Sequence, residues 1–243
     1  MPKQNTAKAK DPSSILNLTT GKEDSNIIIA QPWENIDKFK NNPVRHTGQQ
    51  YLKFLNTEVF SEASKYYLKH GYYTSAPEGT SEYIEFWDEE ERRCKEGYTV
   101  GGVRITGEHY AYLNYGRILA TVDDGKRQRK IDTFPKFLDM DYYWYHELEQ
   151  AEENGEGMIV VKARRKGYSY KNAFGMVWRY NWFPSSVCIL AAYEKTFWAN
   201  TMEMAKNMIN FINENTDWAK GFLIDRQDHI KSGYVEKDPI SGI

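Results

Sequence analysis

The stretch from Met158 to Asn172, which reads MIVVKARRKGYSYKN, limits the possible folds of this chain more than any other. Its first four residues are all apolar and predict a short buried strand. A basic loop follows, with Gly167 and Ser169 close to its end, and an amphipathic helix comes next. The stretch therefore predicts a strand–loop–helix unit, the building block of α/β folds.

A glycine-bearing loop between a strand and a helix is also the layout of a phosphate-binding P-loop. In such a loop, backbone N–H groups hold the phosphates and a Ser or Thr hydroxyl contacts magnesium. The usual pattern is G-x-x-x-x-G-K-[S/T], whereas residues 162–169 read KARRKGYS. Gly167 and Ser169 are in register, but Lys162 replaces the first glycine and Tyr168 replaces the lysine. The alternative is an ordinary strand–helix turn with basic surface residues.

Composition narrows the class of protein. The 243 residues carry a formal net charge of −2, so any contact with nucleic acid is expected to be local. Cys94 and Cys188 lie far apart without ligand-like spacing, which favours reduced thiols over a zinc site. No apolar run approaches the ~20 residues of a membrane span, and the polar N-terminus is unlike a secretory signal. We expect a protein of the cytoplasm that does not enter a membrane.

The N-terminal half predicts helices followed by an antiparallel sheet. Residues 1–26 are polar and predict a flexible tail, and residues 27–131 form a separate region. Within it we expect a helix from Thr47 to His70, ended by Gly71, and a second helix from Thr80 or Ser81 to Gly97. Residues 98–131 predict a small β-meander. Tyr98–Ile105 and Tyr110–Leu119 are rich in residues that favour strands, and a turn is expected between them at Thr106–Glu108. Asp123–Gly125 contains the D-G pair that is typical of a hairpin turn.

Residues 132–243 predict the α/β core. Asp132 or Thr133 is expected to cap a helix from Pro135 to Glu153, crowded with aromatic side chains. Beyond the basic loop, a helix ends at Pro184, an apolar strand covers 187–192, and a long helix covers 194–214. This β-α-β-α order predicts a parallel sheet with a right-handed crossover.

Three segments together resemble the N-terminal ATPase region of the large terminase subunit of tailed bacteriophages. They are the loop from Lys162 to Ser169, the segment GVRITGEHYAYLNYGRI at residues 102–118, and the segment TFPKFLD at residues 133–139, one helix ahead of the loop. The resemblance covers roughly residues 80–215. It implies a P-loop NTPase fold, ATP and Mg²⁺ as ligands, and a role in packaging double-stranded DNA into a procapsid.

The resemblance also explains the unusual loop. Some terminases carry the P-loop lysine at the position of the first glycine, and Lys162, Gly167, Tyr168 and Ser169 fit that form. A phosphate loop needs a cation near the β and γ oxygens, and tyrosine cannot supply it. We therefore assign the lysine role to Lys162, with Lys166 as the alternative, and magnesium contact through the nucleotide to Ser169.

Further roles follow from the resemblance alone. Either Arg164 or Arg165 would neutralise charge on the γ-phosphoryl group, and the other would pair with a carboxylate. Phe134 and Pro135 would present an apolar edge to adenine. Where related motors often carry a glutamine that hydrogen-bonds adenine, this chain has either Asp139 or no clear equivalent. The alternative for Phe134 is a hydrophobic staple ahead of the helix.

An acidic strand to hold magnesium and align water is missing from the pattern. The segment from Gly221 to Asp225 comes closest, but Arg226 follows it instead of a second acid. We therefore expect part of a longer motor, either a fragment or the product of a split gene.

The resemblance implies a viral assembly complex in the host cytoplasm, with double-stranded DNA, the portal protein and the small terminase subunit as partners and a ring homo-oligomer on the portal. Alternative hypotheses are another P-loop NTPase, such as a helicase or kinase, and a non-catalytic module whose basic loop binds a DNA backbone.

Overall fold

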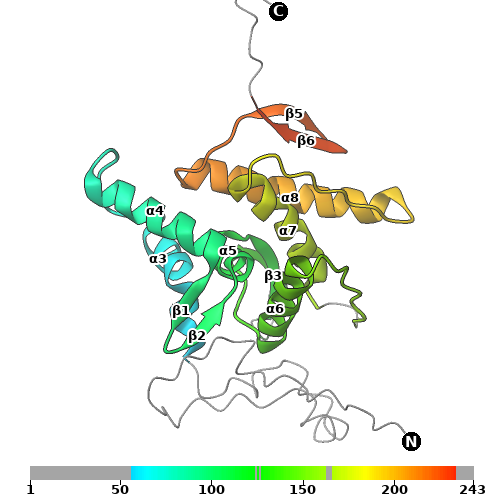
Figure 1. Ribbon diagram of the computed structural model, residues 1–243, viewed down its shortest axis with the longest axis horizontal. Coiled ribbons are helices and arrows are strands. Elements are labelled where there is room, and N and C mark those ends of the chain that lie inside the picture. The colour runs from blue at the N-terminus through cyan, green and yellow to red at the C-terminus, as the bar shows by residue number, and fades with distance from the viewer. Residues whose placement is uncertain (1–55, 124, 126, 163–165, 234–243) are drawn as a thin grey trace, which may run out of the picture.

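A computed structural model of the chain describes residues 56–123, 125, 127–162 and 166–233. These residues form six α-helices, one 3-10 helix and six short strands in a mixed α/β arrangement (Figure 1). In chain order, the elements are η3 (Thr57–Ser61), α3 (Glu62–His70), α4 (Ser81–Glu96), β1 (Tyr98–Val100), β2 (Val103–Ile105), α5 (Gly107–Tyr115), β3 (Ile118–Asp123), β4 (Gln128–Thr133), α6 (Asp139–Glu153), α7 (Tyr168–Trp182), α8 (Lys195–Asn215), β5 (Phe222–Arg226) and β6 (His229–Ser232).

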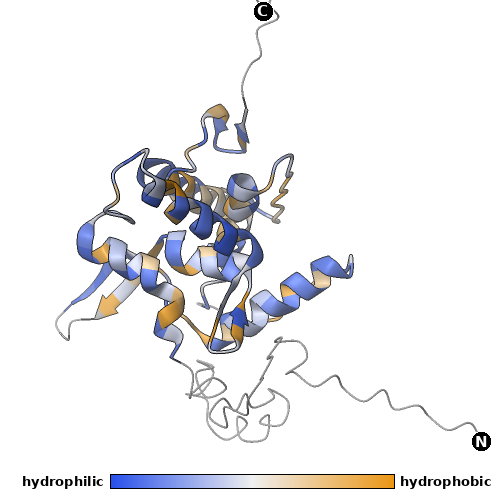
Figure 2. Ribbon diagram, turned by 60° about the vertical axis from the view of Figure 1, so that its left-hand side comes forward, coloured by the Kyte–Doolittle hydropathy of each residue, from blue (hydrophilic) through white to orange (hydrophobic). Residues whose placement is uncertain are grey.

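Helix α5 lies at the centre of the described structure and contacts α3, α4, α6, α7 and α8 (Figure 1). All nine of its residues are buried. Gly107, at its start, lets the helix approach the end of α4, because a Cβ there would lie 2.5 Å from the carbonyl oxygens of Cys94 and Lys95. The surrounding helices mix hydrophilic and hydrophobic residues along their lengths, as amphipathic packing around a core requires (Figure 2).

The central helix corrects the predicted meander. The sequence predicted strand structure at Tyr110–Leu119 and a turn at Thr106–Glu108, but these residues contain α5. Thr106 caps the helix by accepting a hydrogen bond from the backbone N–H of His109 at 3.3 Å. Because α5 is covered on every side, it lacks the polar face by which an amphipathic helix is recognised in a sequence. Its tyrosines, which are common in strands, favoured the strand prediction. The flanking strands instead form two separate hairpins, β1–β2 and β3–β4.

The start of α6 is also corrected. The predicted caps, Asp132 and Thr133, belong to β4, where they pair with Leu119 and Ile118. The hairpin therefore extends further than predicted, and residues 134–138, including Pro135, form a non-helical connection before α6 begins at Asp139.

Several helix boundaries are confirmed. Thr80 caps α4 through the N–H of Tyr83, and Gly97 ends it. Gly71 ends α3 in the left-handed region at φ 81°. Helices α7 and α8 lie within one or two residues of their predicted limits. The tail at 1–26 and the first part of the helix predicted from Thr47 fall outside the described residues.

No parallel sheet forms within the part of the chain that the structure describes. Its three sheets are antiparallel hairpins of two strands each. Residues 158–162 and 187–192 pair with no other described segment, and the side chains of Ile159, Val161, Val187 and Ile189 are 93%, 96%, 84% and 88% exposed. The structure therefore shows no ladder between these two segments.

The aromatic core crosses the predicted boundary between residues 131 and 132. Phe60 of η3 stacks on Phe137, with ring centroids 5.7 Å apart, and Tyr112 of α5 contacts Phe174 of α7 at 5.4 Å. The buried residues of both regions belong to one hydrophobic cluster. The position of α7, which carries the loop residues of interest, is thus set by contacts with the N-terminal helices.

Candidate functional site

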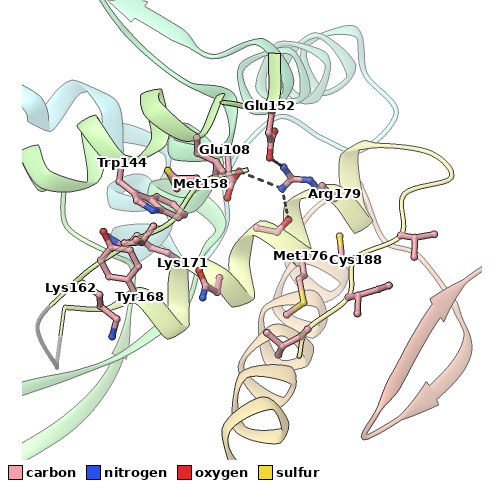
Figure 3. A pocket seen from close by; sticks show the side chains of 17 residues that line it. Glu108, Trp144, Glu152, Met158, Lys162, Tyr168, Lys171, Met176, Arg179 and Cys188 are labelled. Atoms are coloured by element: carbon pink, nitrogen blue, oxygen red, sulfur yellow. Dashed lines mark hydrogen bonds and ion pairs between the residues drawn. The ribbon is translucent and has the colours of Figure 1, made fainter. Parts of the chain in front are cut away.

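A cleft of about 670 Å³ runs along α7, between the extended segments that precede and follow this helix (Figure 3). The segments contribute Met158, Val160 and Lys162 on one side and residues 187–190 on the other. Trp144, Leu148 and Glu152 of α6 and Glu108 of α5 complete the wall. The cleft therefore joins the predicted loop to side chains from two helices that precede it in the sequence.

Helix α7 begins directly after Gly167, as the sequence predicted. Gly167 precedes the helix with φ 74°, a conformation that favours glycine, and its carbonyl oxygen accepts hydrogen bonds from the N–H groups of Tyr170 and Lys171. The first N–H groups of a helix have no acceptor within the helix, and Gly167 has no side chain that could cap them. With the positive end of the helix dipole, this end is suited to an anion.

The structure separates the two candidate lysines. Lys162 lines the cleft, and its Nζ lies 5.6 Å from the centroid of the Tyr168 ring. Lys166 is not among the residues that line the cleft. Ser169 is exposed in the first turn of α7. Arg164 and Arg165, the candidates for charge neutralisation, lie outside the described residues.

A buried ion pair links α7 to α6. Lys171 of α7 is only 1% exposed and binds the carboxylate of Asp141 in α6. Its Nζ also lies 4.0 Å from the centroid of the Tyr168 ring and 5.1 Å from that of Trp144. Burial lowers the pKa of Lys171 and raises that of Asp141, while each charge favours ionisation of the other. The pair anchors the first turn of α7 to α6.

A second group of charges lies further along α7. Arg179 pairs with Glu152 and lies 3.6 Å from Oε2 of Glu108 (Figure 3). Glu108 is 5% exposed, and its Oε1 has no hydrogen-bond partner among the described residues. Burial raises the pKa of Glu108 to about 8, although Arg179 acts in the opposite direction. Glu108 can therefore hold a proton near neutral pH.

Sequence reasoning missed both charge groups. Lys171 and Asp141 are 30 residues apart, and Glu108 and Arg179 are 71 apart, so only the packing of α5, α6 and α7 brings them together. A weak signal was available for Lys171, which follows Tyr168 by three residues and so lies on the same face of the helix.

The predicted adenine contacts lie apart from the cleft lining. Phe134 is 5% exposed and packs against Tyr67 and Phe211, and the Arg117 guanidinium lies 4.4 Å from its ring centroid. Pro135 is also buried. Neither residue lines the cleft with Lys162 and Tyr168, and their contact with a base stays a prediction.

Asp225, the weak candidate for a magnesium-binding acid, lies in β5 and pairs with Lys206 of α8 at 2.7 Å. Strand β5 runs antiparallel to β6 on the opposite side of α8 from α5 (Figure 1). Within the described ranges, no group of three or more His, Cys, Asp or Glu side chains is arranged to hold a metal ion. Cys94 and Cys188 are both free thiols.

Comparison of the chain with family models, curated proteins and solved structures finds no match. Among the helices that the structure describes, none is both long and apolar enough to cross a membrane.

Proposed function

We propose that this chain is the ATP-binding part of a DNA-packaging motor of the terminase large-subunit type. The observation that carries the proposal is that Lys162 and Tyr168, the first residue of α7, line the same cleft, although Gly167 and Ser169 are not among its lining residues. A cation and a row of free N–H groups are the two components that a triphosphate requires from a P-loop. Ser169, in the first turn, would contact Mg²⁺ that is bound to the nucleotide.

We further propose that residues 158–162 and 187–192 act as neighbouring strands of a parallel sheet when further strands cover them. Support comes from the exposure of Ile159, Val161, Val187 and Ile189. Burying each such side chain is worth about 1.5–3 kcal/mol, so the four together represent about 6–12 kcal/mol. That amount is comparable to the whole stability of a typical domain, about 5–15 kcal/mol, and favours covered strands.

In the proposed motor, ATP hydrolysis would drive double-stranded DNA into a procapsid in the host cytoplasm. Its partners would be the portal protein and the small terminase subunit, with a ring of identical subunits on the portal. Arg164 or Arg165 would neutralise the γ-phosphoryl group. Since Arg226 follows Asp225 where a second acid would be needed to hold magnesium and align water, we expect the protein to bind ATP weakly and to turn it over near background.

A titration with Mg·ATP tests the proposal. We expect Lys162→Ala to weaken binding more than Lys166→Ala, because Lys162 lines the cleft and Lys166 does not. Losing a charge-assisted hydrogen bond of about 1.5–3 kcal/mol corresponds to a loss of roughly 10- to 150-fold for Lys162→Ala. Isothermal calorimetry on the wild type and both variants measures this order.

The reverse order would transfer the lysine role to Lys166. Absence of ATP binding by the wild type would contradict the proposed function. If the wild type then bound DNA with a steep dependence on salt and no response to ATP, the non-catalytic DNA-binding alternative would replace it.

A further inference from the structure

Tyr168 occupies the place at which most P-loops carry lysine, and two lysines lie over its ring. Nζ of Lys171 is 4.0 Å from the ring centroid, and Nζ of Lys162 is 5.6 Å from it. Both distances are within the range of about 6 Å over which an ammonium is attracted to an aromatic face. Figure 3 shows Lys162 and Lys171 in different directions from the ring, with Trp144 beside it.

We propose that Tyr168 is a positioning residue, whose ring holds the ammonium of Lys162 beside the N-terminus of α7. This inference rests on the proposed nucleotide site and identifies how the displaced lysine is kept there. Lys162 contacts the phosphates in this account, and Tyr168 acts through Lys162.

The ring itself is held firmly. Trp144 packs edge-on against Tyr168, with centroids 5.7 Å apart and an interplanar angle of 78°. Lys171 is fixed by its bond to Asp141 and is almost fully buried. Because Asp141 balances the charge of Lys171, the second cation at the ring repels Lys162 less than a lone cation would. Tyr168 therefore offers Lys162 a fixed aromatic face.

Lys162 needs such a face, because it is exposed and its side chain has four rotatable bonds. Ordering a free lysine around a ligand costs conformational entropy, and a prior contact with an aromatic ring reduces that cost. Exposed contacts between a cation and an aromatic ring are weak. We therefore expect loss of the ring to weaken ATP binding roughly two- to fivefold, with the effect passing through Lys162.

A double-mutant cycle in Mg·ATP affinity tests the inference. Tyr168→Leu should weaken binding roughly two- to fivefold in the wild type. In the Lys162→Ala background, Tyr168→Leu should not change the affinity for Mg·ATP, because Tyr168 acts only through Lys162. Tyr168→Phe keeps the ring and should bind like the wild type. Equal losses from Tyr168→Leu in both backgrounds would overturn the inference while leaving ATP binding, and thus the proposed function, intact.

A measurement without nucleotide separates the two proposals further. In NMR spectra of the free protein, the Hε protons of Lys162 should show a ring-current shift that is kept in Tyr168→Phe and lost in Tyr168→Leu. An unchanged Lys162 signal in Tyr168→Leu would overturn the inference. If the shift behaves as expected but the wild type binds no ATP, the proposed function fails, and the phosphate-positioning role fails with it. Tyr168→Met serves as the second non-aromatic variant if Tyr168→Leu does not fold.

Discussion

Two opposing effects act on the pKa of the Glu108 carboxyl group. It is buried at the contact of α5 with α7, where loss of water favours its protonated form and the nearby Arg179 favours its ionised form. Burial has the larger effect and raises its pKa to about 8. Gly175 makes room for the carboxyl, since a Cβ at that position would lie 2.9 Å from Oε1. The carboxyl group of Glu108 is therefore expected to be protonated in the folded protein at neutral pH.

This assignment predicts a pH dependence of stability. The unfolded chain ionises Glu108 near pH 4.5, whereas the folded chain keeps the proton up to about pH 8. The resulting stabilisation is complete below pH 4.5 and is lost as pH rises toward 8. Glutamine resembles the protonated acid but does not titrate. As pH rises from 4.5 to 8, the stability of the wild type relative to Glu108→Gln should therefore decrease, by at most about 1.4 kcal/mol per pH unit.

Urea unfolding of both proteins at pH 5, 6.5 and 8 measures the difference. Burial lowers the pKa of His109 and His146, so both proteins should also lose stability in acid below about pH 6.5. That loss is common to both and cancels in the comparison. If the stability of the wild type relative to Glu108→Gln instead rises with pH, Glu108 is ionised in the folded protein and stabilised by Arg179.

At the scale of elements, the arrangement depends on the close contact of α5 with α4. Helix α5 buries every one of its residues, so it requires neighbours on all sides. Gly107 allows one of these contacts, because its Cα lies against the backbone carbonyls of Cys94 and Lys95. Backbone atoms cannot move aside as a flexible side chain can, and the position therefore requires glycine.

We expect Gly107→Ala to lower the free energy of unfolding by about 1–3 kcal/mol or more, because the added methyl overlaps the end of α4. Gly157→Ala is the matched control, since a Cβ at that position meets nothing within 4 Å. Chemical denaturation of the two variants beside the wild type provides the measurement. Equal stability of the two variants would show that α5 and α4 can separate without cost.

These elements also show what the sequence could reveal. The caps at Thr80 and Gly97 and the helix after Gly167 were predictable, because local residue chemistry determines them. Helix α5 was not predictable, because five other helices surround it and it therefore has no polar face. Without a polar face, its sequence lacks the periodicity that indicates an amphipathic helix. In the candidate site, the motif predicted Lys162 and Tyr168, which line the same cleft. Asp141 and Glu108 could not be predicted, because only the packing of distant segments places them near α7.

At the level of the whole molecule, the region around the cleft is incompletely covered. Around the cleft, apolar residues of two extended segments are exposed, while the aromatic core on the other side of α7 is closed. The proposed nucleotide site lies where the first of these segments meets α7. In the proposed function, covering these segments would also enclose the cleft.

Amide NMR of the protein titrated with Mg·ATP tests the central claim most directly. The account predicts that the largest shift changes occur at the backbone N–H groups of Gly167, Tyr168 and Ser169, where the uncapped end of α7 would receive the phosphates. Asp225 and the β5–β6 hairpin should change little. Changes centred on Arg117 and Phe134 instead, or no change in the Gly167–Ser169 amides at saturating ATP, would contradict the account.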